Sequence, residues 1–224
     1  MIESGRPKII GVLDLQGGVQ EHLDHLERLG VIGRPVKHAA EFEGLAGLII
    51  PGGESTCLSR LLNVSDLRAV IDAHYRKGLK LWGTCAGAIL LAKESIGETP
   101  FLGLVDITVS RNAFGSQLDS FSCEILVPAV AQKPVPLTFI RAPKIIRVGE
   151  GVRVLLQIRD YIAAAEDEQS LVTVFHPELT PSLAFHRYFA VKCGLSPLWD
   201  EEWGTDIDLS WTPQGWMQNR SRSH

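Results

Sequence analysis

Hydrophobic residues in the first half of the chain fall into short runs that alternate with amphipathic segments. The runs at 8–15, 33–37, 46–50 and 79–82 are typical of buried strands, and the segments 20–29, 56–62, 67–77 and 86–93 have helical patterns. Short connections between alternating strands and helices favour a parallel sheet that is covered by helices on both faces.

The pattern changes between about residues 104 and 175. Strand-like segments follow one another there with few helices between them, at 105–110, 122–127, 137–140, 152–158, 161–165 and 171–175. We interpret this region as an antiparallel extension of the sheet. A last helix is predicted over 182–192, after Pro181, a residue that helices favour at their start. The predicted fold class is α/β, with a doubly wound, mostly parallel sheet.

The C-terminal stretch differs from the rest in composition. It contains four of the five tryptophans, Trp199, Trp203, Trp211 and Trp216, among acidic residues. We therefore expect one domain over residues 1–194 and a Trp-rich tail of unknown role over 195–224. A solvated tail is one interpretation. Docking on a surface is the other, because four tryptophans are a large apolar area to leave in water.

Composition excludes several functional classes. The 224 residues have a formal net charge of -4, which gives no basic footprint for nucleic acid. No apolar run approaches the ~20 residues of a membrane-spanning helix. The N-terminus lacks the layout of a signal peptide, so we expect a cytoplasmic protein. The four cysteines stand far apart without a Cys-x-x-Cys pair, so neither a zinc site nor a disulfide framework is expected.

Cys85 lies where a hydrophobic strand meets a helical segment, within the sequence Gly-Thr-Cys-Ala-Gly. Small residues on both sides allow a tight turn that presents a nucleophile at the carboxyl end of the strand. The start of the following helix adds positive potential, which favours the thiolate. A lone cysteine is more often a small buried hydrophobe, and we assign that role to Cys57, Cys123 and Cys193.

His176 and Glu178 follow another predicted strand. Because functional groups in such sheets gather at the carboxyl ends of the strands, His176 is expected to face the same edge as Cys85. Glu178 can bind one imidazole nitrogen, which leaves the other free to take the thiol proton. A loop histidine beside a surface glutamate is the alternative for this pair taken alone.

The sequence Pro-Gly-Gly-Glu-Ser-Thr at 51–56 follows the third predicted strand. Its glycines allow the main chain to approach a ligand closely. The N–H groups of Gly53 and of Ala86, the residue after the candidate nucleophile, would together make two oxyanion donors. A simple turn is an equally good interpretation of this segment by itself.

Taken together, these motifs resemble those of class I (triad) glutamine amidotransferases, and more narrowly the branch that serves pyridoxal 5'-phosphate (vitamin B6) synthases. The resemblance extends over about residues 9 to 193, in family order. It is carried by Leu15-Gln16-Gly17 with Glu21-His22, LIIPGGEST at 48–56, GTCAG at 83–87, RNAFG at 111–115 with DSF at 119–121, FIRAP at 139–143 and FHPELT at 175–180.

The resemblance implies a flavodoxin-like sheet and a glutaminase that hydrolyses L-glutamine to L-glutamate and ammonia without a metal or organic cofactor. It implies Cys85, His176 and Glu178 as the catalytic triad, and a glutamine site made by Gly52, Gly53, Glu54, Arg111, Ile140 and Arg141. An arginine can clamp the substrate carboxylate, but the choice between Arg111 and Arg141 stays open, and a purely structural salt bridge is the alternative for either. The ammonia would pass to a separate pyridoxal 5'-phosphate synthase subunit in a hetero-oligomer.

Two alternatives are kept. One is another cysteine hydrolase on the same fold, such as a peptidase or an amidotransferase that serves a different synthase. The other is a non-enzymatic scaffold, although a scaffold has no need of Cys85, His176 and Glu178 together.

Overall fold

A single mixed sheet with helices on both faces forms the centre of the molecule. The computed structural model describes residues 8–111 and 120–198. Five strands form the parallel part, in the order β2-β1-β3-β4-β12. Their bounds are β1 (Ile9–Leu13), β2 (Gly33–Val36), β3 (Leu45–Ile50), β4 (Lys80–Thr84) and β12 (Ser170–Thr173). This arrangement confirms the predicted α/β fold with a doubly wound, mostly parallel sheet.

Beyond β12 the sheet continues through strands that are mostly antiparallel to their neighbours. The order is β11-β9-β6-β5, and β10 pairs with β11 beside this path. The bounds are β5 (Ala92–Ile96), β6 (Val105–Ser110), β9 (Lys144–Val148), β10 (Arg153–Ile158) and β11 (Tyr161–Glu166). The predicted antiparallel extension is thus confirmed.

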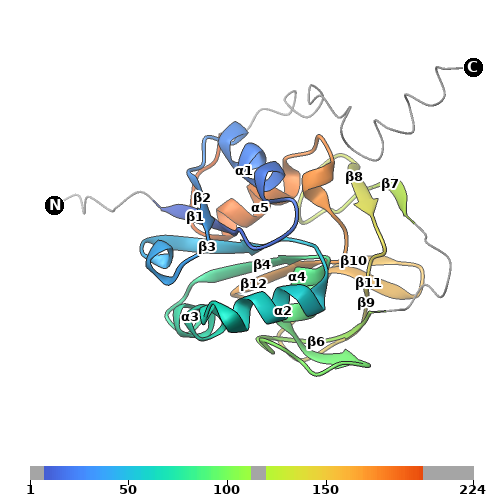
Figure 1. Cartoon of the computed structure of the whole chain (residues 1–224). Coiled ribbons are helices and arrows are strands. Elements are labelled where there is room, and N and C mark those ends of the chain that lie inside the picture. Colours follow the sequence, from blue (N-terminus) through green and yellow to red (C-terminus); the bar gives the residue numbers. More distant parts are fainter. Residues whose placement is uncertain (1–7, 112–119, 199–224) are drawn as a thin grey trace, which may run out of the picture.

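The helices cover the parallel part from both sides (Figure 1). Helices α1 (Val19–Arg28) and α5 (Ala184–Lys192) pack together on one face. Helices α2 (Ser55–Val64), α3 (Leu67–Tyr75) and α4 (Ala86–Leu91) lie on the other. Two short 3₁₀ helices, η1 (Ala39–Phe42) and η2 (Pro177–Leu179), follow β2 and β12.

Several predicted elements were wrong in detail. The helix predicted over 86–93 ends at Leu91, because the chain turns extended at Ala92 and pairs as β5 with β6. Two segments assigned to the extension form a separate two-stranded sheet, β7 (Phe121–Ile125) with β8 (Val135–Phe139). The last strand-like segment, assigned to the extension as well, pairs as β12 in parallel with β4. Strand β9 was not predicted, since Lys144 and Arg147 interrupt its apolar pattern.

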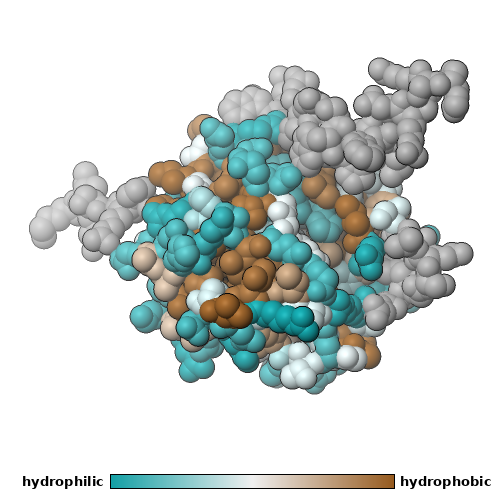
Figure 2. Space-filling model, viewed as in Figure 1, coloured by the Kyte–Doolittle hydropathy of each residue, from teal (hydrophilic) through white to brown (hydrophobic). Residues whose placement is uncertain are grey.

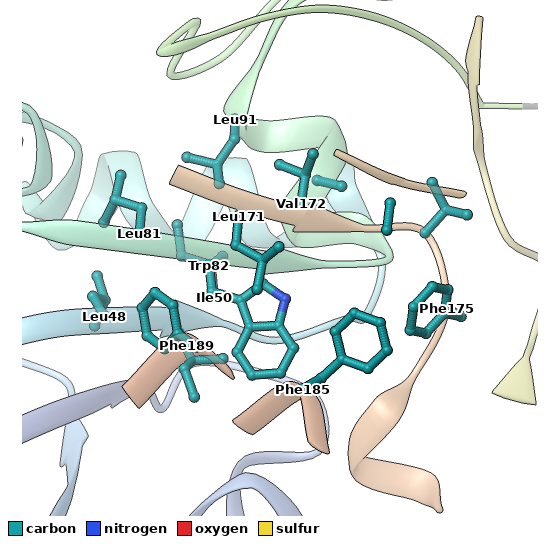
Figure 3. Packing of buried hydrophobic residues seen from close by; sticks show 14 of the residues in the cluster. Leu48, Ile50, Leu81, Trp82, Leu91, Leu171, Val172, Phe175, Phe185 and Phe189 are labelled. Carbon is teal, nitrogen blue, oxygen red and sulfur yellow. The ribbon is translucent and has the colours of Figure 1, made fainter. Parts of the chain in front are cut away.

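Trp82 on β4 is the largest side chain in the core, and it is fully buried. It points toward α5, where its ring lies 5.5 Å from that of Phe189, while Leu81 points to the opposite face of the sheet (Figure 3). The indole N–H donates a hydrogen bond to Thr173 Oγ1 on β12, at 3.2 Å. Trp82 therefore connects β4, β12 and α5, the elements that lead into the residues discussed below.

The face of the molecule in Figure 2 is mostly hydrophilic, with hydrophobic residues interspersed in its middle. Over the described ranges 8–111 and 120–198, no helix combines the length and the apolar character needed to cross a membrane.

Trp82→Ala should lower the free energy of unfolding by about 3–5 kcal/mol, the usual cost of truncating a buried aromatic residue. Denaturant unfolding followed by circular dichroism measures this change. Val64→Ala is the control, because Val64 is 86 % exposed and its truncation should change stability by less than about 0.5 kcal/mol. Equal stability of the two variants would contradict the placement of Trp82 in the core.

Candidate active site

Cys85 occupies a strained turn between β4 and α4. Its backbone has φ 48° and ψ −105°, a conformation that non-glycine residues rarely adopt. Only 6 % of the residue is exposed. A Cβ atom on Gly83 would lie 2.5 Å from the carbonyl carbon of Gly87, and one on Gly87 would lie 2.1 Å from the carbonyl oxygen of Ile50. The flanking glycines are therefore required by close main-chain packing, and the predicted tight turn between strand and helix at Cys85 is confirmed.

His176 is brought next to Cys85 by the parallel pairing of β4 with β12. Thr84 is the register partner of Thr173, and the N–H of Cys85 donates to the Thr173 carbonyl at 2.8 Å. The N–H of His176 donates in turn to the carbonyl of Thr138 on β8, also at 2.8 Å. A Cβ on Gly52 would lie 2.4 Å from His176 Cε1 and 3.2 Å from Cys85 Cβ. Both side chains therefore line the same space beside Gly52.

Glu178 lies in η2 and is 1 % exposed. Its Oε1 is 2.8 Å from Nδ1 of His176, so the ring donates from Nδ1 to the carboxylate. The alternative of a loop histidine beside a surface glutamate is excluded, because the carboxylate is buried.

The pKa values of His176 and Glu178 are shifted in opposite directions. Burial disfavours the charged form of His176, but the Glu178 carboxylate and hydrogen bonds with Cys85 and Glu178 outweigh it and raise the pKa of His176 well above its usual range. Burial also disfavours the Glu178 carboxylate, yet the rings of His22 and His176 lower its pKa to about 2. These shifts favour the charged form of both residues, with the His176 imidazolium donating to the Glu178 carboxylate.

The Gly52-Gly53 loop approaches the site as main chain. A Cβ on Gly17 would lie 1.9 Å from the Gly52 carbonyl oxygen, so the turn after β1 lies directly against this peptide. Gly53 has φ 154°. Gln16 accepts a hydrogen bond from the N–H of Glu54 at 3.1 Å through its side-chain oxygen. Gly17 and Gln16, in the turn between β1 and α1, thus hold the Gly52-Gly53 loop in place.

Glu54 and Arg111 contact each other. The Glu54 carboxylate is half-exposed, caps α2 by accepting from the N–H groups of Thr56 and Cys57, and forms an ion pair with Arg111. Hydrogen bonds from Thr56 and Cys57, together with the Arg111 charge, lower the pKa of Glu54 to about 2 against the effect of desolvation. Arg111 also lies 3.1 Å from Glu98. The Glu54 carboxylate and the Arg111 guanidinium therefore lie side by side, and both are accessible to solvent.

The other predicted residues are adjacent in sequence to residues of the site. Ile140 and Arg141 follow β8, two and three residues after Thr138, whose carbonyl accepts from the His176 N–H, and Arg141 has φ 48°. Ala86 begins α4, where an N–H has no acceptor within its own helix. Residues 112–115 and 119 of the sequence motifs, and most of the tail at 195–224, lie outside the described residues.

One contact was not predicted as part of the site. His22 appeared in the sequence only within a motif, yet it faces Glu178. The burial of His22 beside Glu178 could not be inferred from local pattern, because the two residues are far apart in the sequence. Within residues 8–111 and 120–198, no group of three or more His, Cys, Asp or Glu is arranged to hold a metal ion.

Comparison with known proteins identifies the family. The model of the SNO glutamine amidotransferase family matches residues 12–195. The chain belongs to this family. Membership confirms the interpretation as a glutamine amidotransferase and as an enzyme, and it favours neither a peptidase nor a scaffold.

Curated relatives agree with this family and narrow it to the vitamin B6 branch. The chain is 57 % identical over 216 residues to "Pyridoxal 5'-phosphate synthase subunit PdxT" of Syntrophus aciditrophicus, covering 96 % of each chain. It is 46 % identical over 185 residues to the protein of the same name from Clostridium kluyveri, covering 82 % of this chain and 98 % of the relative. The Syntrophus match covers so much of the chain that it includes most of the stretch 195–224.

Solved structures support the fold of this family member. A crystal structure of a glutamine amidotransferase matches with a TM-score of 0.78 at 42 % identity, covering 83 % of this chain and 99 % of the other. A glutamine amidotransferase from Thermotoga maritima matches with a TM-score of 0.58 at 10 % identity, over 97 % and 93 % of the two chains. At 10 % identity, this second match supports the fold and carries no information about function.

Glu178→Gln should lower the pKa of His176, because it removes the negative charge that stabilises the imidazolium. An NMR titration of the His176 ring protons measures the change, which should exceed about one unit for a buried neighbour of opposite charge. Asp72→Asn is the control, since Asp72 pairs with Arg76 on α3. An unchanged His176 pKa in Glu178→Gln would contradict the contact.

Proposed function

We propose that this glutamine amidotransferase hydrolyses L-glutamine with Cys85 as nucleophile, His176 as base and Glu178 as the residue that orients His176. The observation that carries the proposal is the meeting of Cys85 and His176 beside Gly52, with the buried Glu178 on the far nitrogen of the ring. In a Cys-His-carboxylate arrangement the imidazole takes the thiol proton, and the carboxylate fixes its tautomer and stabilises its charge.

Hydrolysis proceeds in two halves. The Cys85 thiolate attacks the side-chain amide carbon, and the tetrahedral intermediate collapses as His176 donates its proton to the departing ammonia. A glutamyl thioester on Cys85 remains. His176 then takes a proton from water, the hydroxide attacks the thioester, and glutamate leaves as the thiol is restored.

The oxyanion of each tetrahedral intermediate would be bound by the N–H groups of Gly53 and Ala86. Ala86 supports this role because it begins α4 directly after Cys85. Gly53 supports it because its loop packs as main chain against Cys85 and His176. Two preorganised donors of this kind stabilise the charge that develops during attack.

Glutamine would be held by Gly52, Gly53, Glu54, Arg111, Ile140 and Arg141. Glu54 and Arg111 have the charges that a free amino acid needs, an anion for the α-ammonium and a guanidinium for the α-carboxylate. An exposed ion pair contributes little, about 0–1 kcal/mol, so a zwitterion can replace it at small cost. We therefore favour Arg111 over Arg141 for the carboxylate.

Ammonia would pass to a pyridoxal 5'-phosphate synthase subunit in a hetero-oligomeric complex. Support comes from the relatives, which are named as subunits of that synthase. The cytoplasm as the place of reaction is part of the same proposal.

Residues 1–194 would form the glutaminase domain, and 195–224 a separate tail. The start of the tail is attached, since the N–H of Leu198 donates to the Leu29 carbonyl at 2.8 Å and its side chain contacts Gly30. This contact favours a tail that docks over one that is solvated throughout.

Cys85→Ser should abolish nearly all release of ammonia from glutamine, measured in a coupled assay with the synthase subunit present. Cys57→Ser, Cys123→Ser and Cys193→Ser should keep most of it. Burial raises the pKa of Cys193 to about 12 and raises that of Cys123, which makes both poor nucleophiles. Labelling of a cysteine other than Cys85 by a glutamine-analogue alkylator would overturn the assignment.

Arg111→Lys should raise the KM for glutamine roughly 10–100-fold, because a two-pronged hydrogen bond to a carboxylate is lost while the charge is kept. Steady-state kinetics of Arg111→Lys, Arg141→Lys and the control Arg147→Lys distinguish the two candidates. Arg147 pairs with Asp106 elsewhere on the surface, so its variant should be unchanged. A larger KM effect in Arg141→Lys would transfer the carboxylate to Arg141.

A further inference from the structure

Three histidines are buried in the core behind Glu178. His22 and His25 come from α1 and His186 from α5, and His22 and His186 have no exposed surface. His186 and His22 pack against Trp82, with ring centroids 4.9 Å and 5.7 Å from that of the indole, and His25 packs against His186. A polar group without a hydrogen-bond partner is costly in such an apolar environment, so the partners of the ring nitrogens matter.

The contacts form a line that begins at the triad. His22 Nε2 lies 3.5 Å from Oε2 of Glu178, the oxygen that His176 does not use. His22 Nδ1 lies 2.8 Å from Nε2 of His186. Among the described residues, His22 Nε2, Glu178 Oε2 and His186 Nδ1 are buried without a hydrogen bond of regular geometry. The first two of these atoms face each other.

The rings of His22 and His186 are both neutral near pH 7. Burial lowers the pKa of His22 to about 4 in spite of the Glu178 carboxylate, and it lowers the pKa of His186 well below its ordinary value. A neutral imidazole has one N–H and one bare nitrogen, so each ring can donate only once. His22 therefore supports the carboxylate through an N–H dipole and not through a full charge.

Only one tautomer of His22 satisfies its surroundings. With the proton on Nδ1, the bare Nε2 would face an anionic oxygen in a dry interior, which is repulsive. With the proton on Nε2, that N–H points at Glu178, and Nδ1 accepts from the Nε2–H of His186. Among the ring nitrogens of His22 and His186, only Nδ1 of His186 then has no partner, and it carries a lone pair. Each N–H of the two rings has an acceptor.

We propose that His22 is a positioning residue of the glutaminase site, which donates from Nε2 to Oε2 of Glu178, and that His186 fixes the tautomer of His22. Each oxygen of Glu178 then has its own donor, Nδ1–H of His176 on one side and Nε2–H of His22 on the other. The carboxylate cannot turn away from His176 without breaking a buried hydrogen bond. This proposal rests on the triad assignment made above.

The decisive variants are His22→Leu and His22→Gln, assayed in the full chain with the synthase subunit. His22→Leu removes the donor and should lower kcat roughly 10–100-fold with little change in the glutamine KM, by analogy with the outer-shell partners that orient metal-ligating histidines. His22→Gln places an amide N–H where Nε2 was and should recover most of the lost kcat.

His25→Gln is the matched control. His25 lies on the same helix, and its ring centroid is 4.4 Å from that of His186, but its ring nitrogens contact the backbone carbonyls of Glu21 and Thr180. Its kcat and KM should be unchanged. A similar loss of kcat in His25→Gln and His22→Leu would mean that the cluster acts only through packing, and it would overturn the proposal.

A readout independent of turnover accompanies the kinetics. In the ¹⁵N-histidine-labelled wild type, the ring nitrogen shifts of His22 should show a neutral ring with the proton on Nε2, and His22→Leu should shift the Nδ1–H resonance of His176. A proton on Nδ1 of His22 would overturn the proposal. Absence of glutaminase activity in the wild type with synthase would instead refute the proposed function, while the nitrogen shifts would still decide the contact.

Discussion

The hydrogen bond from the Cys85 N–H to the Thr173 carbonyl is the constraint on which the site depends. Parallel strands end at the same edge of a sheet, and this bond aligns the last residues of β4 and β12 there. Beyond this point the two segments diverge. After β4 the chain turns sharply at Cys85 into α4, whereas after β12 it continues for three residues to His176, directly before η2. The geometry of the reacting pair is therefore a property of strand register.

Local sequence pattern predicted the parts of the site that depend on neighbouring residues. The elbow at Cys85 and the spacing of His176 and Glu178 are local, because a turn and a two-residue reach require no distant partner. The parallel sheet was also predictable, since its strands are continuous apolar runs. These features follow from covalent connectivity and hydrophobic burial alone.

Other features depend on contacts between segments far apart in the sequence. His22 and His186 are separated by 164 residues, and nothing in the pattern of either helix shows that the two rings meet. The helix after Cys85 ends at Leu91 although Ala92 and Lys93 are good helix formers, because pairing of β5 with β6 overrides local propensity. The pairing of Glu54 with Arg111 likewise joins two segments that only the fold brings together.

The glycines around Cys85 have a consequence for how such a site changes over time. Added Cβ atoms would lie 1.9 Å from main chain at Gly17, 2.1 Å at Gly87 and 2.5 Å at Gly83, and 2.4 Å from the His176 ring at Gly52. The walls that these glycines make are thus main chain, packed against other main chain or against the His176 ring, and a glycine has no side chain to trim. Mutation has little means of altering this part of the cavity while the fold survives. Change between related chains is then expected farther out, at exposed side chains that contact neither the triad nor the glutamine site.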